Sequence, residues 1–295
     1  MSGSEWLTGR FEASRERLRA IAYRMLGTLT EADDAVQESW LRVNQADARG
    51  VENLEGWFTT VLARVCLNIL RARKSRREES LEVRTAGKGM GVEAKSLGPE
   101  DEAVLGESVG LALLVVLDRL DPAERVAFVL HDVFDVAFEE IARILGKSPA
   151  ATRQLASRAR RRVRGASRGS GAALAEQRET VEAFLAALRA GNIDDLLAVL
   201  DPDVVRRADR FAVGSAEMRE IHGARRVAEE ALKYRDMAQT ARLIQVNGGG
   251  GIVVAPHGNL RTVIACTVEG HRITKMEVIA DPERLRRLNL TVFPD

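Results

Sequence analysis

Residues Phe138–Val163 read FEEIARILGKSPAATRQLASRARRRV, and this stretch decides how the middle of the chain folds. Its apolar residues recur at helical spacing as far as Leu145. Gly146 can adopt the positive φ that ends such a helix. Ser148 then offers an N-cap hydroxyl, and Pro149 stands at the first position of a second helix. The stretch predicts a helix-turn-helix.

The second helix of this motif places apolar residues on one side and polar or cationic residues on the other. Side chains of the second kind can donate hydrogen bonds to base edges and phosphates. The alternative interpretation is an amphipathic helix with a solvated charged face. The candidates for contacts with duplex DNA are Ser148, Thr152, Arg153, Gln154, Ser157, Arg158 and Arg161.

Upstream, residues 8–77 are predicted to form a helical domain, because apolar residues recur with a period of about 3.6. Thr30 can cap one of its helices, whose first turn is acidic. The last helix of this domain ends in a basic run from Arg71 to Arg77. A second basic module follows a glycine-containing linker, residues 78–99, so the two modules could bind DNA sites separated by a gap.

The rest of the chain divides into a second helical domain, residues 100–165, a short joint at 166–174, and a third domain at 175–295. In the second domain, Asp121 is predicted to cap a helix, with Glu124 completing a capping box. The third domain has helices first and alternating strands after them. This order predicts an α+β domain with an antiparallel meander.

Composition limits the classes of protein that the chain can represent. Its 295 residues suffice for two or three domains, and the 45% hydrophobic content can form real cores. Two cysteines exclude a disulfide scaffold and a cysteine-rich zinc site. We find no signal peptide, membrane-spanning stretch or cofactor motif, and we expect a soluble cytoplasmic protein.

Three segments resemble parts of bacterial RNA polymerase sigma factors of the extracytoplasmic-function group. Glu31–Arg42 is similar to the helix that binds core polymerase, and Glu55–Arg71 to the helix that faces the minus-10 element. Leu120–Leu130, with the helix-turn-helix, resembles sigma domain 4, which reads the minus-35 element. The third domain points to the SigJ-like subgroup, which carries a SnoaL-like domain. The resemblance implies two all-α sigma domains followed by an α+β, cone-shaped SnoaL-like barrel.

The resemblance also implies roles for individual residues, carried over by position. For core polymerase these are Asp33, Asp34, Gln37, Glu38 and Leu41. For the melted minus-10 DNA they are Arg64, Arg71, Arg73 and Lys74. A regulatory contact between domains is expected at Asn247, Gly248, Gly249, Asp281 and Arg284.

Some positions depart from the pattern of the subgroup. Asn68 stands where an acid is frequent, and residues 78–99 lack the subgroup's Trp-Leu-Pro-Glu-Pro element. The stretch Asn247–Gly251 ends in glycine, where the subgroup often has lysine. The sigma resemblance survives these changes, but the subgroup's mechanism of control does not transfer with it.

We therefore predict a sigma factor, not an enzyme, that binds core RNA polymerase and promoter DNA, with the duplex at minus-35 and melted DNA at minus-10. Its third domain would modulate activity in cis; whether a separate anti-sigma protein also acts is left open. One alternative is a SnoaL-type isomerase or cyclase with a helical extension, and another is a ligand-responsive helix-turn-helix regulator. The enzyme alternative would draw its acid or base from Asp209, His222, Tyr234, Asp236, His257 and His271.

Overall fold

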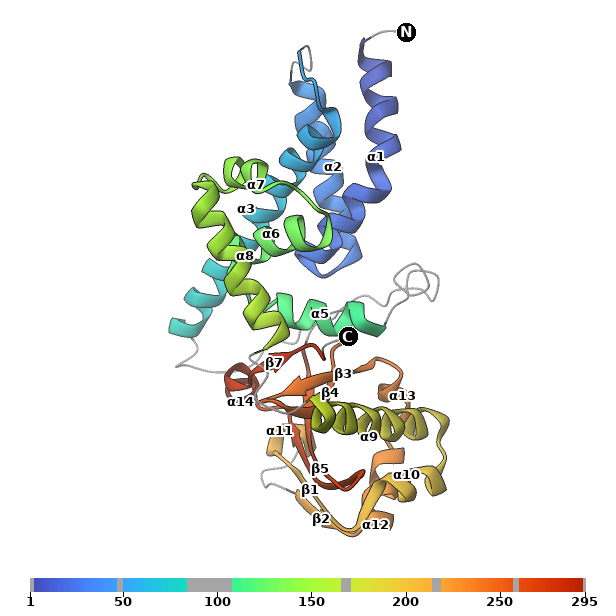
Figure 1. Ribbon diagram of the computed structural model, residues 1–295. Helices are drawn as coiled ribbons and strands as arrows, with labels where there is room; N and C mark the ends of the chain where they lie inside the picture. Colours follow the sequence, from blue (N-terminus) through green and yellow to red (C-terminus); the bar gives the residue numbers. More distant parts are fainter. Residues whose placement is uncertain are drawn as a thin grey trace. The chain divides into compact units, whose positions relative to one another are not determined.

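The computed structural model describes residues 3–46, 50–83, 108–165, 171–213, 219–256 and 260–293 (Figure 1). By their contacts, the described elements group into two units. The first ends at Arg160 and the second contains the sheet. Among the described residues, no helix is long and apolar enough to cross a membrane.

The first unit is entirely helical. Its elements are α1 (Gly3–Leu26), α2 (Leu29–Gln45), α3 (Leu54–Val83), α6 (Pro122–Phe128), the π-helical turn η1 (Val129–Val133), α7 (Phe138–Leu145) and α8 (Pro149–Arg164), whose last turn groups with the second unit.

An aromatic cluster holds α1, α2 and α3 together. The ring centroids of Phe11 and Phe58 lie 5.1 Å apart in an edge-on arrangement, and those of Phe11 and Trp40 are also 5.1 Å apart. Edge-on and tilted pairs are favourable geometries for aromatic rings. Trp57 is half-buried, and its ring is tilted against that of Phe58, with the centroids 5.8 Å apart.

The predicted helix-turn-helix is confirmed. Gly146 ends α7 with φ 64°, and the Ser148 hydroxyl accepts a hydrogen bond from the Ala151 amide at 3.2 Å to cap α8. Another predicted cap, Thr30, is wrong. Helix α2 is capped by Thr28, whose hydroxyl accepts from the Glu31 amide, so it begins before Thr30. Asp121 is the N-cap residue of α6 and precedes Pro122, as predicted, but its side chain makes no capping hydrogen bond, and its carboxylate pairs with Lys74 of α3.

The second unit contains α5 and the C-terminal part of the chain. Its elements are α5 (Ser108–Leu117), α9 (Gly171–Ala190), α10 (Ile193–Val199), β1 (Leu200–Ala208), α11 (Arg210–Val213), β2 (Arg219–His222), α12 (Ala224–Leu232), α13 (Arg235–Ala238), β3 (Ala241–Val246), β4 (Gly249–Val254), β5 (Thr262–Glu269), β6 (Arg272–Ile279), α14 (Pro282–Arg287) and β7 (Leu290–Thr291).

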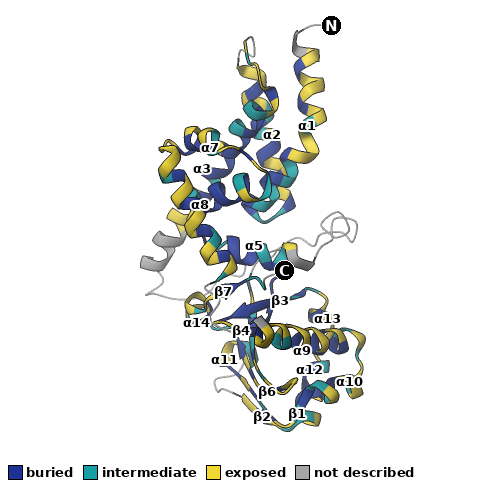
Figure 2. Cartoon of the chain, viewed as in Figure 1, coloured by how far each residue is buried: buried dark blue, intermediate teal, exposed yellow. Residues whose placement is uncertain are grey.

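One seven-stranded sheet, in the order β2-β1-β6-β5-β4-β3-β7, organises this unit. The strands from β3 to β6 form the predicted antiparallel meander. In addition, β1, a strand that the sequence did not predict, pairs in parallel with β6, so the sheet is mixed. Helix α9 packs on β3, β4, β5 and β6, and its exposed residues run along the outer side in Figure 2.

The glycine run between β3 and β4 has a local explanation. Asn247 and Gly248 have φ values of 54° and 89°, the positive pair that a two-residue hairpin turn requires. A Cβ at Gly250 would lie 3.1 Å from Val181 on α9, and one at Gly251 only 2.5 Å from the side chain of Val246. Turn geometry and close packing thus account for these glycines.

Two expected domain limits differ from the described elements. Helix α3 continues past Arg77 to Val83, into the stretch expected as linker. Helix α5, expected in the second helical domain, groups by its contacts with the C-terminal unit up to Val116. Residues 84–107 and most of the joint 166–174 lie outside the described residues.

Candidate nucleic-acid interface

The outward side of α8 carries most of the side chains predicted to meet duplex DNA. Its apolar side buries Leu155, Ala156, Ala159 and Val163. Thr152 is also fully buried and donates a hydrogen bond to the Ser148 carbonyl at 3.0 Å, so it has a structural role and does not face solvent. The exposed candidates are Ser148, Arg153, Gln154, Ser157, Arg158 and Arg161.

Two arginines on this surface already have carboxylate partners. Arg153 pairs with Glu139 of α7 at 3.0 Å and lies over the Phe138 ring, 5.5 Å from its centroid. Arg158 pairs with Glu124 of α6 at 3.2 Å. Both side chains of the Arg153–Glu139 pair are more than half exposed, so this pair is weak enough to exchange for a phosphate or a base edge, whereas Glu124, the partner of Arg158, is only 5% exposed.

The backbone that follows β7, the last strand, caps the C-terminal end of α8. The amide of Val292, directly after β7, donates a hydrogen bond to the carbonyl of Val163 at 2.9 Å. Carbonyls in the last turn of a helix have no partner within the helix. The backbone after β7 therefore stabilises the last turn of the helix that carries the DNA candidates.

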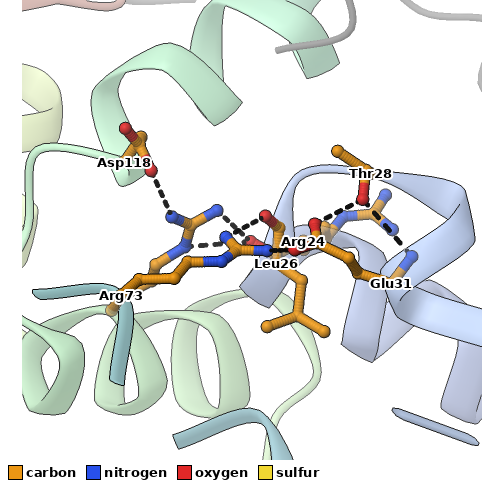
Figure 3. Close-up of polar contacts among 7 residues, drawn as sticks. Arg24, Leu26, Thr28, Glu31, Arg73 and Asp118 are labelled. Atoms are coloured by element: carbon orange, nitrogen blue, oxygen red, sulfur yellow. Dashed lines mark hydrogen bonds and ion pairs between the residues drawn. The ribbon is translucent and has the colours of Figure 1, made fainter. Parts of the chain in front are cut away.

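The four cations predicted for minus-10 DNA on α3 have different environments. Arg64 and Arg71 are exposed, and a guanidinium nitrogen of Arg64 lies 3.5 Å from the Arg143 carbonyl of α7. Arg73 is only 21% exposed; it pairs with Glu31 and donates to the Leu26 carbonyl at 2.8 Å (Figure 3). Arg73 thus ties α3 to the α1–α2 turn, and we no longer assign it to DNA.

Lys74 belongs to a seam inside the first unit, where α1 and α3 meet α6. We define the α3–α6 seam by Arg24 and Lys74 on one side and Asp121 and Arg125 on the other. Lys74 pairs with Asp121 at 2.5 Å. A cavity of about 290 Å³ lies at the same place, so the seam is not densely packed.

Arg125 is the buried centre of the seam and was missed in the sequence. Its side chain is 2% exposed, and it donates to the Arg24 carbonyl at 3.3 and 3.4 Å and to Asp118 at 3.3 Å. Its helix, α6, is buried almost throughout. A charged residue within such a helix was the available signal, because buried guanidinium groups need partners.

Helix α2 exposes the residues predicted to bind polymerase. Asp33 pairs with Arg19 through two hydrogen bonds of 2.7 and 3.1 Å, and Glu38 pairs with Arg42 at 2.9 Å. Asp34 and Gln37 are exposed. The Leu41 side chain is 49% exposed, one of a few large apolar side chains in the described residues that lie in solvent. The face therefore combines carboxylates with an apolar contact.

The residues expected to form a regulatory contact have local partners in the second unit. The Asn247 side-chain oxygen accepts from the Asn289 amide at 2.9 Å. Asp281 caps α14 by accepting from the amides of Glu283 and Arg284. Arg284 pairs with Glu277 and lies 3.7 Å from Asp209. These contacts account for the polar residues of the set, and Gly248 and Gly249 belong to the hairpin turn and its strand.

The side chains weighed for acid–base chemistry do not form a cluster in the described residues. Burial alone would raise the pKa of Asp209, but hydrogen bonds from the amides of Asp281, Ala212 and Ala280 outweigh it and hold the pKa below its ordinary value. His222 is an exposed partner of Glu220 at 2.8 Å. The His271 amide donates to Glu176 from a strand turn. His257 lies outside the described residues, Asp236 lies in α13, and Tyr234 lines a cavity considered below.

Groups of three metal-ligating side chains do not occur in the part of the chain that the structure describes. Both cysteines are buried, and burial raises the pKa of the Cys66 and Cys266 thiols to about 12. Buried neutral thiols of this kind are inert.

Comparison with known families and proteins connects these surfaces to one family. The profile of Sigma-70 region 2 matches residues 10–76, and that of Sigma-70 region 4 matches residues 110–163. The probable ECF RNA polymerase sigma factor SigI of Mycobacterium tuberculosis is 33% identical over 287 residues, which cover 97% of each chain. The ECF RNA polymerase sigma factor SigJ of the same species is 39% identical over 219 residues, 74% of this chain and 69% of SigJ.

A solved structure, that of Mycobacterium tuberculosis SigJ, covers 94% of this chain and 98% of its own, with 31% identity and a TM-score of 0.45. The relation to SigI extends over nearly the whole length of both chains. The chain belongs to the extracytoplasmic-function sigma factors of bacterial RNA polymerase and is of the SigJ-like type.

Proposed function

We propose that the chain binds core RNA polymerase through the exposed face of α2 and reads the minus-35 element through the outward face of α8. Backbone contacts to melted minus-10 DNA are assigned to Arg64, Arg71 and Lys74 on α3. The exposed polar face of α8, on a capped helix-turn-helix, is the observation that carries this proposal. In vitro transcription with core polymerase and the full chain tests it.

The packed first unit represents the resting state in this proposal. The two promoter elements are named for positions about 25 base pairs apart, roughly 85 Å of duplex at 3.4 Å per base pair. Arg64 on the helix assigned to one element lies within 3.5 Å of Arg143 in the helix-turn-helix assigned to the other. The α3–α6 seam must therefore open before one chain can reach both elements.

We expect Asp121→Lys to raise the apparent affinity for core polymerase by about 2- to 10-fold. The variant replaces the Lys74–Asp121 pair by two like charges, and both side chains of the native pair are 51% exposed, so the change is of the size of a surface ion pair. When a smaller fraction of the chains has the α3–α6 seam closed, the apparent affinity for core polymerase rises in proportion. The measurement is a titration of the full chain against fixed core polymerase in run-off transcription.

Glu182→Lys is the matched control, because Glu182 is exposed on α9 and the charge change is the same. It should leave the titration unchanged. An Asp121→Lys curve that coincides with the native one, or moves to higher concentration, contradicts the resting-state proposal.

The C-terminal unit acts in cis, we propose, by supporting the last turn of α8. The support for this step is the hydrogen bond from the Val292 amide to the Val163 carbonyl. Arg161 lies in the last turn of α8, where loss of the bond would increase fraying. The unit would thus strengthen minus-35 contacts.

Val292→Pro should lower minus-35-dependent transcription by about 2- to 12-fold, because proline lacks the donating N–H and one hydrogen bond contributes about 0.5–1.5 kcal/mol. Val292→Ala keeps the N–H and should transcribe like the native chain. The comparison uses one promoter with an intact and a scrambled minus-35 element. Equal yields from Val292→Pro and Val292→Ala would contradict a supporting role.

A further inference from the structure

The second unit contains an apolar cavity of about 100 Å³ between α9 and the sheet, and this cavity is open to solvent. Side chains from α9 and from strands β4, β5 and β6 form most of its wall. The buried members of this wall include Phe184, Leu185, Leu188, Ile252 and Met276. Cavities of about 150 Å³ with such walls hold molecules as large as benzene, so this one has room for a small apolar group.

One side chain of the wall is charged. Arg206, on β1, is 6% exposed and lines the cavity. Its Nη1 nitrogen is buried and has no hydrogen-bond partner among the described residues. A buried guanidinium nitrogen without a hydrogen-bond partner destabilises a protein, so Nη1 is expected to have a partner in the working molecule.

The carboxylate of Glu230, which interacts electrostatically with Arg206, also pairs with other cations. Glu230 on α12 pairs with Lys233 at 2.7 Å and with Arg219 at 3.3 Å. Burial lowers the pKa of the Arg206 guanidinium from its ordinary value, and the nearby Tyr234 and Glu230 act in the opposite direction. A guanidinium group remains protonated in proteins, so Arg206 presents a positive charge to the cavity.

The rim of the cavity is apolar and lies in solvent. Tyr234 and Met237 line the cavity and are 38% and 46% exposed. Phe211, next to the lining residue Ala212, is 49% exposed. These three side chains are among the few large apolar ones exposed in the described residues. A rim of this kind suits a ligand whose hydrocarbon part extends beyond a small cavity.

We propose that this cavity binds a small apolar monocarboxylate, whose carboxylate accepts hydrogen bonds from Arg206 and whose hydrocarbon part lies against the cavity wall and the Tyr234–Met237 rim. A single guanidinium group matches one carboxylate through two parallel N–H donors. A phosphate group carries more negative charge than a carboxylate, and the apolar wall would not stabilise the additional charge. The site does not depend on the role of the chain in transcription.

Calorimetric titration of the full chain with hexanoate, and with hexanamide as its neutral counterpart, tests the proposal. The native chain should bind hexanoate at least tenfold more tightly than hexanamide. Arg206→Met should weaken hexanoate binding at least tenfold and change hexanamide binding less than threefold. Equal affinities of the native chain for the two compounds, or unchanged hexanoate binding by Arg206→Met, would overturn the proposal.

A melting temperature separates an effect on folding from an effect on binding, and a second variant tests the rim of the cavity. Arg206→Met should melt at the native temperature or above it when no ligand is present, because it removes a buried charged group whose Nη1 nitrogen has no hydrogen-bond partner. A lower melting temperature together with retained hexanoate binding would make Arg206 a structural residue and overturn the assignment. Met237→Glu changes an exposed side chain of the rim, against which the hydrocarbon part of both compounds lies, so it should weaken the binding of both, and that of the anion hexanoate more strongly.

Discussion

Replacing Arg153 with alanine is expected to lower transcription from a promoter with an intact minus-35 element by about 5- to 150-fold, the effect of losing one base-reading side chain. Arg153 lies on the exposed face of α8, in its second turn, where recognition helices contact base edges. The double variant Arg153→Ala, Arg158→Ala should lose more. The measurement is run-off transcription with core polymerase at a fixed concentration of the full chain.

The ion pair between Arg153 and Glu139 supplies a control for a purely structural role. Glu139→Gln removes the charge of the partner and leaves Arg153 in place. If Arg153 served only to join α7 and α8, both variants would lose activity to the same extent. If Arg153 reads DNA, Glu139→Gln should transcribe at least as well as the native chain, because the guanidinium no longer has to leave a carboxylate.

Base substitutions in the minus-35 element separate recognition from general affinity. The native chain should discriminate between the intact and substituted templates, and Arg153→Ala should discriminate less at the position that Arg153 reads. A residue that contacts only phosphate would weaken both templates equally. Full discrimination by the double variant would contradict the assignment of α8 as the recognition helix.

The sequence is informative where local rules and tertiary structure agree. The helix-turn-helix was predicted because Gly146, Ser148 and Pro149 each have a local conformational role. The cap of α2 was misplaced because Thr28 and Thr30 are both plausible caps by type, and only the fold selects between them. Meander strands were recognised by alternation, whereas β1 was missed because its partner β6 is more than sixty residues away in sequence.

The polar contacts of buried cations could not be predicted for a related reason. Arg73 was assigned to DNA and Arg125 was missed, because their partners include the backbone carbonyls of Leu26 and Arg24, which have no sequence signature. Arg206 was overlooked because exposed arginines are common in this chain. Its burial depends on a pairing of β1 with β6 that the sequence pattern did not reveal.

Leu41→Glu is expected to lower transcription at limiting concentrations of the chain by about 30- to 1000-fold, the range for losing an interface hot spot of about 2–4 kcal/mol. Leu41 is 49% exposed on α2, and it shares the outward face with Asp34 and Gln37 at helical spacing. A carboxylate placed at the apolar centre of that face would have to lose its water on binding without gaining a partner. The free chain should unfold at its native temperature, because the side chain lies in solvent.

Trp6→Glu is the matched control for this variant. Trp6 is a large apolar side chain on α1 in the same unit, it is 45% exposed, and it lies outside the face assigned to polymerase. Loss of activity by Leu41→Glu alone would place the apolar contact on α2, whereas equal loss by both variants would indicate a general effect of charge on this unit. Binding of each variant to core polymerase without DNA completes the test. A Leu41→Glu chain that binds core polymerase as tightly as the native one contradicts the assignment, since the face on α2 would then lie away from the interface.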